Sequence, residues 1–150
     1  MKETSEIDLS FAATELPIRK AKSEIKEKIG DAETLIVIGE TGSGKTTQLP
    51  QILLETLQLG EKIAITQPRR VAATSIANYV AEQVGTKIGD KVGYTIRFDD
   101  STTEGTQINF MTDGILIRKI QEDPLLMDYS IVMIDEVHER SLNIDFSLGL

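Results

Sequence analysis

Cysteine and tryptophan are absent from this 150-residue chain, and it has a single histidine. Without cysteine, neither a disulfide framework nor a thiolate zinc site can form. No apolar run approaches the ~20 residues that a membrane-spanning helix needs, and residues 1–6 are polar and acidic, unlike a signal-peptide core. These absences predict an intracellular protein with no membrane partner, cytoplasmic or, in a eukaryote, nuclear.

Basic residues are also in short supply, since the net charge is −8. Such a balance argues against a protein that coats nucleic acid over its whole surface, although it allows a local basic track. The length fits one domain, and 40% hydrophobic residues are enough for a packed core.

A phosphate-binding loop is the most informative motif that is present. The pattern G-x-x-x-x-G-K-[ST] is matched by Gly39, Glu40, Thr41, Gly42, Ser43, Gly44, Lys45 and Thr46, with Thr47 next in the chain. Backbone N–H groups of such a loop cradle nucleotide phosphates, Lys45 is expected to reach the β- and γ-phosphates, and the Thr46 hydroxyl to bind Mg²⁺. Gly42 and Gly44 allow backbone torsions that a Cβ would hinder. The sequence therefore predicts a site for ATP or another nucleoside triphosphate.

The context of this loop strengthens that interpretation. A short apolar run, Leu35–Ile38, precedes it and is typical of a buried parallel strand. A helix-like apolar pattern follows it and ends at Gly60. Pro50 falls inside that predicted helix, where it removes one hydrogen bond.

Adjacent carboxylates end a second apolar run, Ile131–Ile134. Asp135 is expected to hold Mg²⁺, directly or through water, and Glu136 to polarise the attacking water as general base. Thr46, Asp135 and Glu136 are thus the candidate metal ligands, and the candidate catalytic residues are Lys45, Asp135, Glu136 and His138. His138 lies two positions beyond the candidate base, which favours a role in coupling the nucleotide to a second ligand. Acidic residues also end strands simply because the next loop is solvated, so the argument depends on the phosphate loop.

Alternating strands and helices predict an α/β fold with a largely parallel sheet. The expected strands are residues 34–38, 62–66, 92–97, 107–111 and 131–134. The expected helices are residues 17–30, 45–58, 69–84 and 114–121, and residues 99–105 read as a turn between two strands. Residues 1–15 form a polar lead that is expected to be loosely ordered.

Four segments in order resemble the first RecA-like domain of a DEAH-box helicase of superfamily 2. The resemblance runs from about residue 16 to the end, in segments similar to motif I (39–48), motif Ia (66–73), motif Ib (112–114) and motif II (135–138). Thr66-Gln67-Pro68-Arg69-Arg70 is the discriminating segment, because most other phosphate-loop ATPases lack it. Val137 stands where the family pattern has alanine, a change that packing should tolerate.

The resemblance implies roles for further residues. Those expected to contact the nucleic-acid backbone are Arg69, Arg70, Arg97, Thr112 and Gly114. Tyr79 occupies a place where many relatives carry an arginine that stacks on adenine, so a tyrosine could stack there as well. The resemblance also implies Mg-ATP hydrolysis coupled to movement along a single strand, RNA in preference to DNA, with duplex unwinding and a protein activator as a further partner.

The family pattern continues beyond motif II, so residues 16–150 are interpreted as the N-terminal part of the domain, truncated after motif II and incomplete at the C-terminus. A strand carrying motif III and a second RecA-like domain with arginine fingers are the expected missing partners. The chain alone is therefore expected to be marginally stable, to bind nucleotide weakly and not to unwind duplexes.

Two alternatives stay open on the residues. A phosphate-loop enzyme of another class, such as a nucleotide kinase, would leave residues 66–73 and 135–138 unexplained. A non-catalytic nucleic-acid-binding module would commonly have lost the lysine or the base, yet Lys45, Thr46, Asp135 and Glu136 are all present.

Overall fold

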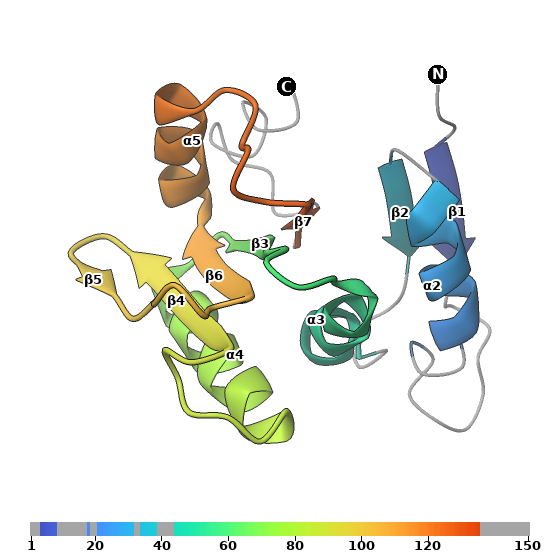
Figure 1. The fold of residues 1–150 in the computed structure, drawn as a ribbon, viewed down its shortest axis with the longest axis horizontal. Coiled ribbons are helices and arrows are strands. Elements are labelled where there is room, and N and C mark those ends of the chain that lie inside the picture. The colour runs from blue at the N-terminus through green and yellow to red at the C-terminus, as the bar shows by residue number, and fades with distance from the viewer. Residues whose placement is uncertain (1–3, 9–17, 19–20, 32–33, 39–43, 136–150) are drawn as a thin grey trace. The chain divides into compact units, whose positions relative to one another are not determined.

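The computed structural model describes residues 4–8, 18, 21–31, 34–38 and 44–135 (Figure 1). The chain divides into two compact units, Met1–Thr56 and Leu57–Leu150. The first contains strands β1 and β2 and helices α2 and α3, and the second contains the remaining strands and helices.

In the first unit, β1 (Thr4–Asp8) pairs in parallel with β2 (Thr34–Ile38), in register from Thr4 opposite Thr34 to Asp8 opposite Ile38. The predicted bounds of β2 are confirmed. The expectation of a loosely ordered lead over residues 1–15 is wrong for β1. The sequence of β1 is mostly polar and has no apolar run from which a strand could be predicted. The strand forms because its backbone pairs with β2, which is distant in the chain.

Two helices complete the first unit. Helix α2 (Lys22–Asp31) continues one residue past Gly30, where the sequence predicted its end. Helix α3 (Lys45–Thr56) runs through Pro50, whose side chain is buried. The Lys22 ammonium donates to Glu55 Oε1 at 3.0 Å, and Lys26 pairs with the other oxygen of the same carboxylate. These ion pairs connect the start of α2 to the end of α3.

The second unit is built on a five-stranded sheet with the order β5-β4-β6-β3-β7. Its strands are β3 (Ile63–Gln67), β4 (Val92–Ile96), β5 (Asp99–Asp100), β6 (Ile108–Thr112) and β7 (Ile131–Ile134). All neighbours pair in parallel except β5, which is antiparallel to β4. The predicted α/β class with a largely parallel sheet is confirmed, and β5 is an unpredicted short strand inside the expected turn.

Helices α4 (Arg70–Gln83) and α5 (Asp113–Glu122) lie on opposite faces of this sheet (Figure 1). The topology requires this, because right-handed crossovers that move in opposite directions along a sheet place their helices on opposite faces. From β3 the chain crosses to β4 through α4, whereas from β6 it crosses the other way to β7 through α5. The side chains that α4 buries are small, namely Ala73, Ala77, Val80 and Ala81, so its backbone can approach the sheet closely.

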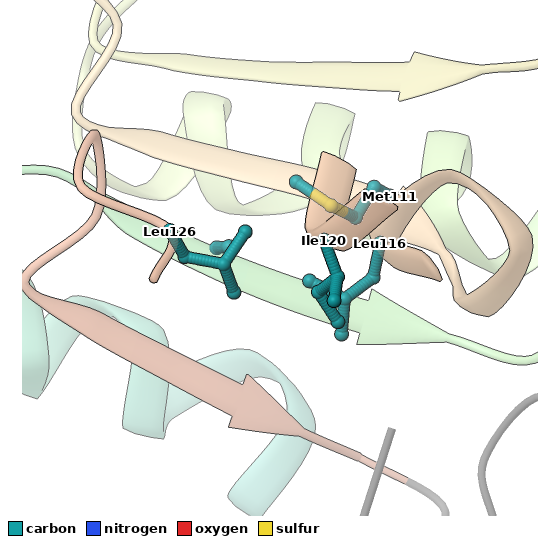
Figure 2. Packing of buried hydrophobic residues seen from close by; sticks show 5 residues of the cluster. Met111, Leu116, Ile120 and Leu126 are labelled. Atoms are coloured by element: carbon teal, nitrogen blue, oxygen red, sulfur yellow. The ribbon is translucent and has the colours of Figure 1, made fainter. Parts of the chain in front are cut away.

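On the α5 side the core is a cluster of apolar side chains from strand, helix and loop (Figure 2). Its members are Ala64, Met111, Leu116, Ile120 and Leu126, with Ile115 and Tyr129 packed against them. Because side chains alternate along a strand, the neighbours of Ala64, Ile63 and Ile65, project to the other face and are also fully buried. The central strands are thus buried on both faces, as parallel strands usually are.

Candidate nucleotide and nucleic-acid site

The phosphate loop meets helix α3 at Gly44 and Lys45. Gly44 has a φ of +89°, a left-handed conformation that confirms the predicted need for glycine there. Lys45, Thr46 and Thr47 form the first turn of α3, are half-buried, and have no acidic neighbour in that turn. The first turn of α3 itself therefore places no carboxylate at the positive end of the helix dipole, which suits an anion. The predicted loop residues Gly39, Glu40, Thr41, Gly42 and Ser43 lie outside the described residues.

In the second unit, the carboxyl ends of four parallel strands gather the predicted ligand-binding residues along one edge of the sheet. Gln67, the last residue of β3, is opposite Thr112, the last residue of β6. Thr66 is opposite Ile134, so Asp135 comes next on the β7 side. Ligands in open α/β sheets bind outside the carboxyl ends of the strands. We call this row, Asp135, Gln67 and Thr112, the edge row.

A buried hydrogen bond joins two members of the edge row. Gln67 Nε2 donates to Asp135 Oδ2 at 2.6 Å, and the two residues are 1% and 8% exposed. The sequence places Gln67 within motif Ia but indicates no role for it. The available signal was a long polar side chain directly after Thr66, at the end of a segment that begins with the apolar run Ile63–Ile65.

The chemistry of Asp135 fits a magnesium ligand. Mg²⁺ prefers hard oxygen donors, and near phosphates it is usually held by one or two carboxylates rather than by a full protein cage. The amide of Gln67 is neutral, so its hydrogen bond orients the Asp135 carboxylate without cancelling its charge. Consistently, among the described residues no cluster of three or more His, Cys, Asp or Glu side chains could hold a metal ion by itself.

Two arginines mark the start of α4. Arg69 is the N-cap residue, with φ −124° and ψ 139°, and Arg70 is the first helical residue. Both are exposed, which confirms the predicted position of this pair at a helix start. Cations there oppose the helix dipole, so the arrangement costs stability and favours a functional role. Tyr79, further along α4, is 44% exposed.

The motif Ib residues start helix α5. Thr112 is its N-cap residue, but the threonine hydroxyl does not cap the helix. Gly114 is exposed in the first turn. Between them, Asp113 is only 4% exposed, and burial raises the pKa of its carboxyl. Asp113 received no role from the sequence, because its burial follows from the packing of α5 on the sheet.

Arg97 follows the carboxyl end of β4, in the turn that leads to β5. The next residue, Phe98, has a φ of +66° and is 93% exposed. Few bulky residues adopt this conformation, and those that do cluster at functional sites. The sequence singled out Arg97, whereas the backbone conformation of Phe98 could not be anticipated.

The structure thus brings Asp135, Thr112, Gly114, Arg69, Arg70 and Arg97 to the carboxyl ends of neighbouring strands. Glu136 and His138 lie outside the described residues. Lys45, Thr46 and Thr47 belong to the first unit and Asp135 to the second. The expectation that Lys45 and the acidic pair share one cavity stays a prediction.

A membrane-crossing helix was not expected, and within the part of the chain that the structure describes, no helix combines the length and apolar character that a span requires.

Comparison with known proteins places these motifs in a family. The DEAD/DEAH box helicase family matches residues 19–147. The chain is 52% identical over 136 residues to the ATP-dependent RNA helicase HrpA of Escherichia coli, covering 89% of this chain and 10% of that protein. It is 53% identical over 137 residues to the probable ATP-dependent RNA helicase DHX35 homolog of Caenorhabditis elegans, covering 90% and 19%.

The human probable ATP-dependent RNA helicase DHX35 is 48% identical over 138 residues, with 90% of this chain and 20% of that protein covered. The chain therefore spans about a tenth to a fifth of the length of these relatives. The matched residues include all four segments that resemble helicase motifs I, Ia, Ib and II, together with the α/β sheet that carries motifs Ia, Ib and II. The chain belongs to the DEAD/DEAH box helicase family, as a first RecA-like domain of the DEAH-box type.

Proposed function

We propose that this chain is the nucleotide-binding part of an ATP-dependent RNA helicase. The observation that carries the proposal is the edge row, in which residues of motifs Ia, Ib and II end adjacent parallel strands. One side of such an edge can hold a nucleotide while the loops beside it hold a nucleic-acid strand. The names of the relatives supply RNA as the expected strand.

On the nucleotide side, the loop residues 39–44, Lys45, Thr46 and Thr47 bind the phosphates, with Lys45 at the β- and γ-phosphates. Thr46, Asp135 and Glu136 would hold Mg²⁺, and the ion would neutralise charge at the phosphates. Glu136 takes the proton of the attacking water. Tyr79 offers an exposed ring on which the base can stack. ATP and Mg²⁺ are thus the proposed cofactors.

On the nucleic-acid side, Arg69, Arg70 and Arg97 hold phosphates, and Thr112 and Gly114 contact the same backbone. Such contacts grip a strand without reading its sequence. His138 couples the two sides because it follows the proposed base by two residues. A second RecA-like domain that supplies arginine fingers, an intracellular location and a protein activator complete the proposal, and the chain alone hydrolyses little ATP and does not unwind.

The test has two parts. Binding of a fluorescent ATP analogue to the 150-residue chain is measured with and without Mg²⁺, for the natural sequence and for Lys45→Ala. Loss of a charged hydrogen-bonding group at a phosphate is expected to weaken binding by at least about tenfold. Binding that is indifferent to both Mg²⁺ and Lys45 would overturn the nucleotide site.

The second part measures ATP hydrolysis with single-stranded RNA, in the chain and in any longer natural form of the protein. RNA is expected to stimulate hydrolysis only in a form that contains a second domain, and Glu136→Gln to abolish that hydrolysis while nucleotide binding persists. Nucleotide binding without hydrolysis in every form would instead favour a non-catalytic binding module.

A further inference from the structure

The hydrogen bond between Gln67 and Asp135 connects two motifs that lie 68 residues apart in the chain. The bond is 2.6 Å long, and both residues are almost completely buried. A buried carboxylate needs donors, because an unsatisfied polar group in the interior is costly. Gln67 supplies one of them from the neighbouring strand.

Gln67 is also tied closely to the arginines that begin α4. Only Pro68 and the N-cap residue Arg69 separate it from the first helical residue, Arg70. Proline fixes its own φ and restricts the residue before it to extended backbone. The link from the Gln67 backbone to α4 is therefore short and stiff, so a shift at the start of α4 reaches Gln67.

We propose that Gln67 is a positioning residue that orients the Asp135 carboxylate toward Mg²⁺ and links this orientation to occupancy of the arginines on α4. This inference rests on the proposed function of Asp135. The side-chain amide of Gln67 donates a hydrogen bond to Asp135, and the Gln67 backbone leads within three residues to Arg70, a proposed nucleic-acid contact. Neighbouring groups that orient a metal ligand commonly change metal affinity by ~10–100-fold when they are removed.

The residue type suits this role. An amide donates a hydrogen bond and leaves the carboxylate fully charged, whereas lysine or arginine would neutralise the charge that attracts the metal. An apolar side chain would fill the space but remove a donor. Glutamate has nearly the same shape, yet it would place a second carboxylate against the first at this short distance.

A purely structural role for the amide is the competing explanation, and the chain offers a matched control. Asn109 on β6 is also a buried amide, 7% exposed, and its Nδ2 donates to Thr95 Oγ1 at 3.2 Å and to Tyr129 Oη at 3.3 Å. It is the second residue of its strand, three residues before Thr112 of the edge row. Asn109→Asp therefore tests the general cost of turning a buried amide into an acid.

The experiment compares Gln67→Glu, Gln67→Met and Asn109→Asp with the natural chain. The Mg²⁺ concentration that half-saturates binding of a fluorescent ATP analogue is measured with and without single-stranded RNA, and unfolding is followed by circular dichroism. Both Gln67 variants are expected to raise the half-saturating Mg²⁺ concentration at least about tenfold and to reduce the effect of RNA on it. Asn109→Asp should change it by about twofold or less, even if it unfolds more easily.

Equal defects in Asn109→Asp and in the Gln67 variants would overturn the inference. So would an effect of RNA on the Mg²⁺ requirement that survives unchanged in both Gln67 variants. Failure of the natural chain to show Mg²⁺-dependent nucleotide binding would overturn the proposed function itself.

Discussion

The guanidinium carbon of Arg97 lies 4.9 Å from the centre of the Phe98 ring, in a turn where the Phe98 backbone is left-handed. A cation over an aromatic face is stabilising, but at an exposed site the gain is only ~0.5–1 kcal/mol. A left-handed residue with a Cβ costs ~1–2 kcal/mol. The contact therefore offsets only part of the backbone cost.

Replacing Phe98 by glycine and by alanine separates the stabilisation by the Arg97 contact from the cost of the left-handed backbone. Both changes remove the contact with Arg97, but only glycine relieves the left-handed backbone. Phe98→Gly is therefore expected to be more stable than Phe98→Ala by ~1 kcal/mol, measured by urea unfolding of the chain. Equal stability of the two variants would show that the backbone at Phe98 is not strained.

Arg70→Ala tests the nucleic-acid contact at the start of α4. If Arg70 binds one phosphate, its removal should weaken binding of a labelled single-stranded RNA and reduce the slope of log K against log salt by ~0.7. Fluorescence anisotropy at several salt concentrations measures the slope. Arg118→Ala is the matched control, because Arg118 is an exposed arginine on α5 whose ion pair is with Glu122, one turn away. An unchanged slope in Arg70→Ala would exclude that contact.

Glu55→Gln tests the link between α2 and α3. Hydrogen bonds from Lys26 and Lys22 lower the pKa of the Glu55 carboxyl below its ordinary 4.5. Because the folded-state pKa is lowered, this stabilisation is present above the ordinary value and is lost as the pH falls through the lowered one. The carboxylate is 47% exposed, so the loss at neutral pH should be only ~0.5 kcal/mol and should vanish in high salt.

The matched control for Glu55 is Glu24→Gln, which breaks only the pair with Lys28 inside α2. Urea unfolding at neutral and acid pH, at low and high salt, measures all of these differences. A Glu55→Gln variant that loses the same stability at acid pH as at neutral pH would contradict the electrostatic explanation.

Asp113→Asn tests the buried carboxyl at the start of α5. Burial raises the pKa of Asp113 above its ordinary 3.8, so the folded protein holds this proton to a higher pH than the unfolded chain does. The free energy of unfolding of the natural chain should therefore fall as the pH rises from the ordinary pKa of 3.8 through the raised pKa of Asp113. Asp113→Asn is expected to remove that fall and to be the more stable chain at neutral pH.

Thermal unfolding from acid to neutral pH provides the measurement. Asp128→Asn changes the same charge at an exposed position and should keep the fall. A fall that persists in Asp113→Asn would mean that another group causes it.

Leu116→Ala tests the core on the α5 side. Leu116 is fully buried in the cluster with Met111 and Ile120, so truncation should cost ~2–5 kcal/mol in the free energy of unfolding. Leu125→Ala removes the same atoms from a side chain that is 80% exposed, and its cost should be several-fold smaller. Similar losses in the two variants would contradict this description of the core.

Much of the fold could be predicted because it follows from local pattern. The apolar runs before the phosphate loop and before the acidic pair give β2 and β7 their observed bounds. Helices α3, α4 and α5 begin within one residue of the predicted starts. By contrast, β1 and β5 contain polar residues that pair only because a neighbouring strand is present. The partner of β1 is distant in the chain, and β5 is only two acidic residues long, so neither strand leaves a mark on local composition.

In the candidate site, too, some features could be predicted from the sequence and others could not. Lys45, Asp135 and the arginines belong to short motifs that are visible in the chain. The contact of Gln67 with Asp135 depends instead on β7 lying beside β3, with Ile134 opposite Thr66. No feature of either motif alone specifies that order, and the same holds for the burial of Asp113.

Hydrogen bonds from the segment after β5 hold the hairpin that carries Arg97 in place. The Ser101 N–H donates to the Tyr94 carbonyl at 3.0 Å, and the Tyr94 N–H donates to the Ser101 Oγ at 2.9 Å. The Thr103 hydroxyl donates to the Gly89 carbonyl at 2.8 Å, and the Thr106 hydroxyl donates to the Asp90 carbonyl at 2.8 Å. The segment also packs closely over Gly93, where a Cβ would lie 3.0 Å from Thr102 Cγ2 and would push that side chain aside. Because these hydrogen bonds fix the base of the hairpin, an RNA strand that binds Arg97 under the proposed function would have to adapt its own path to the hairpin.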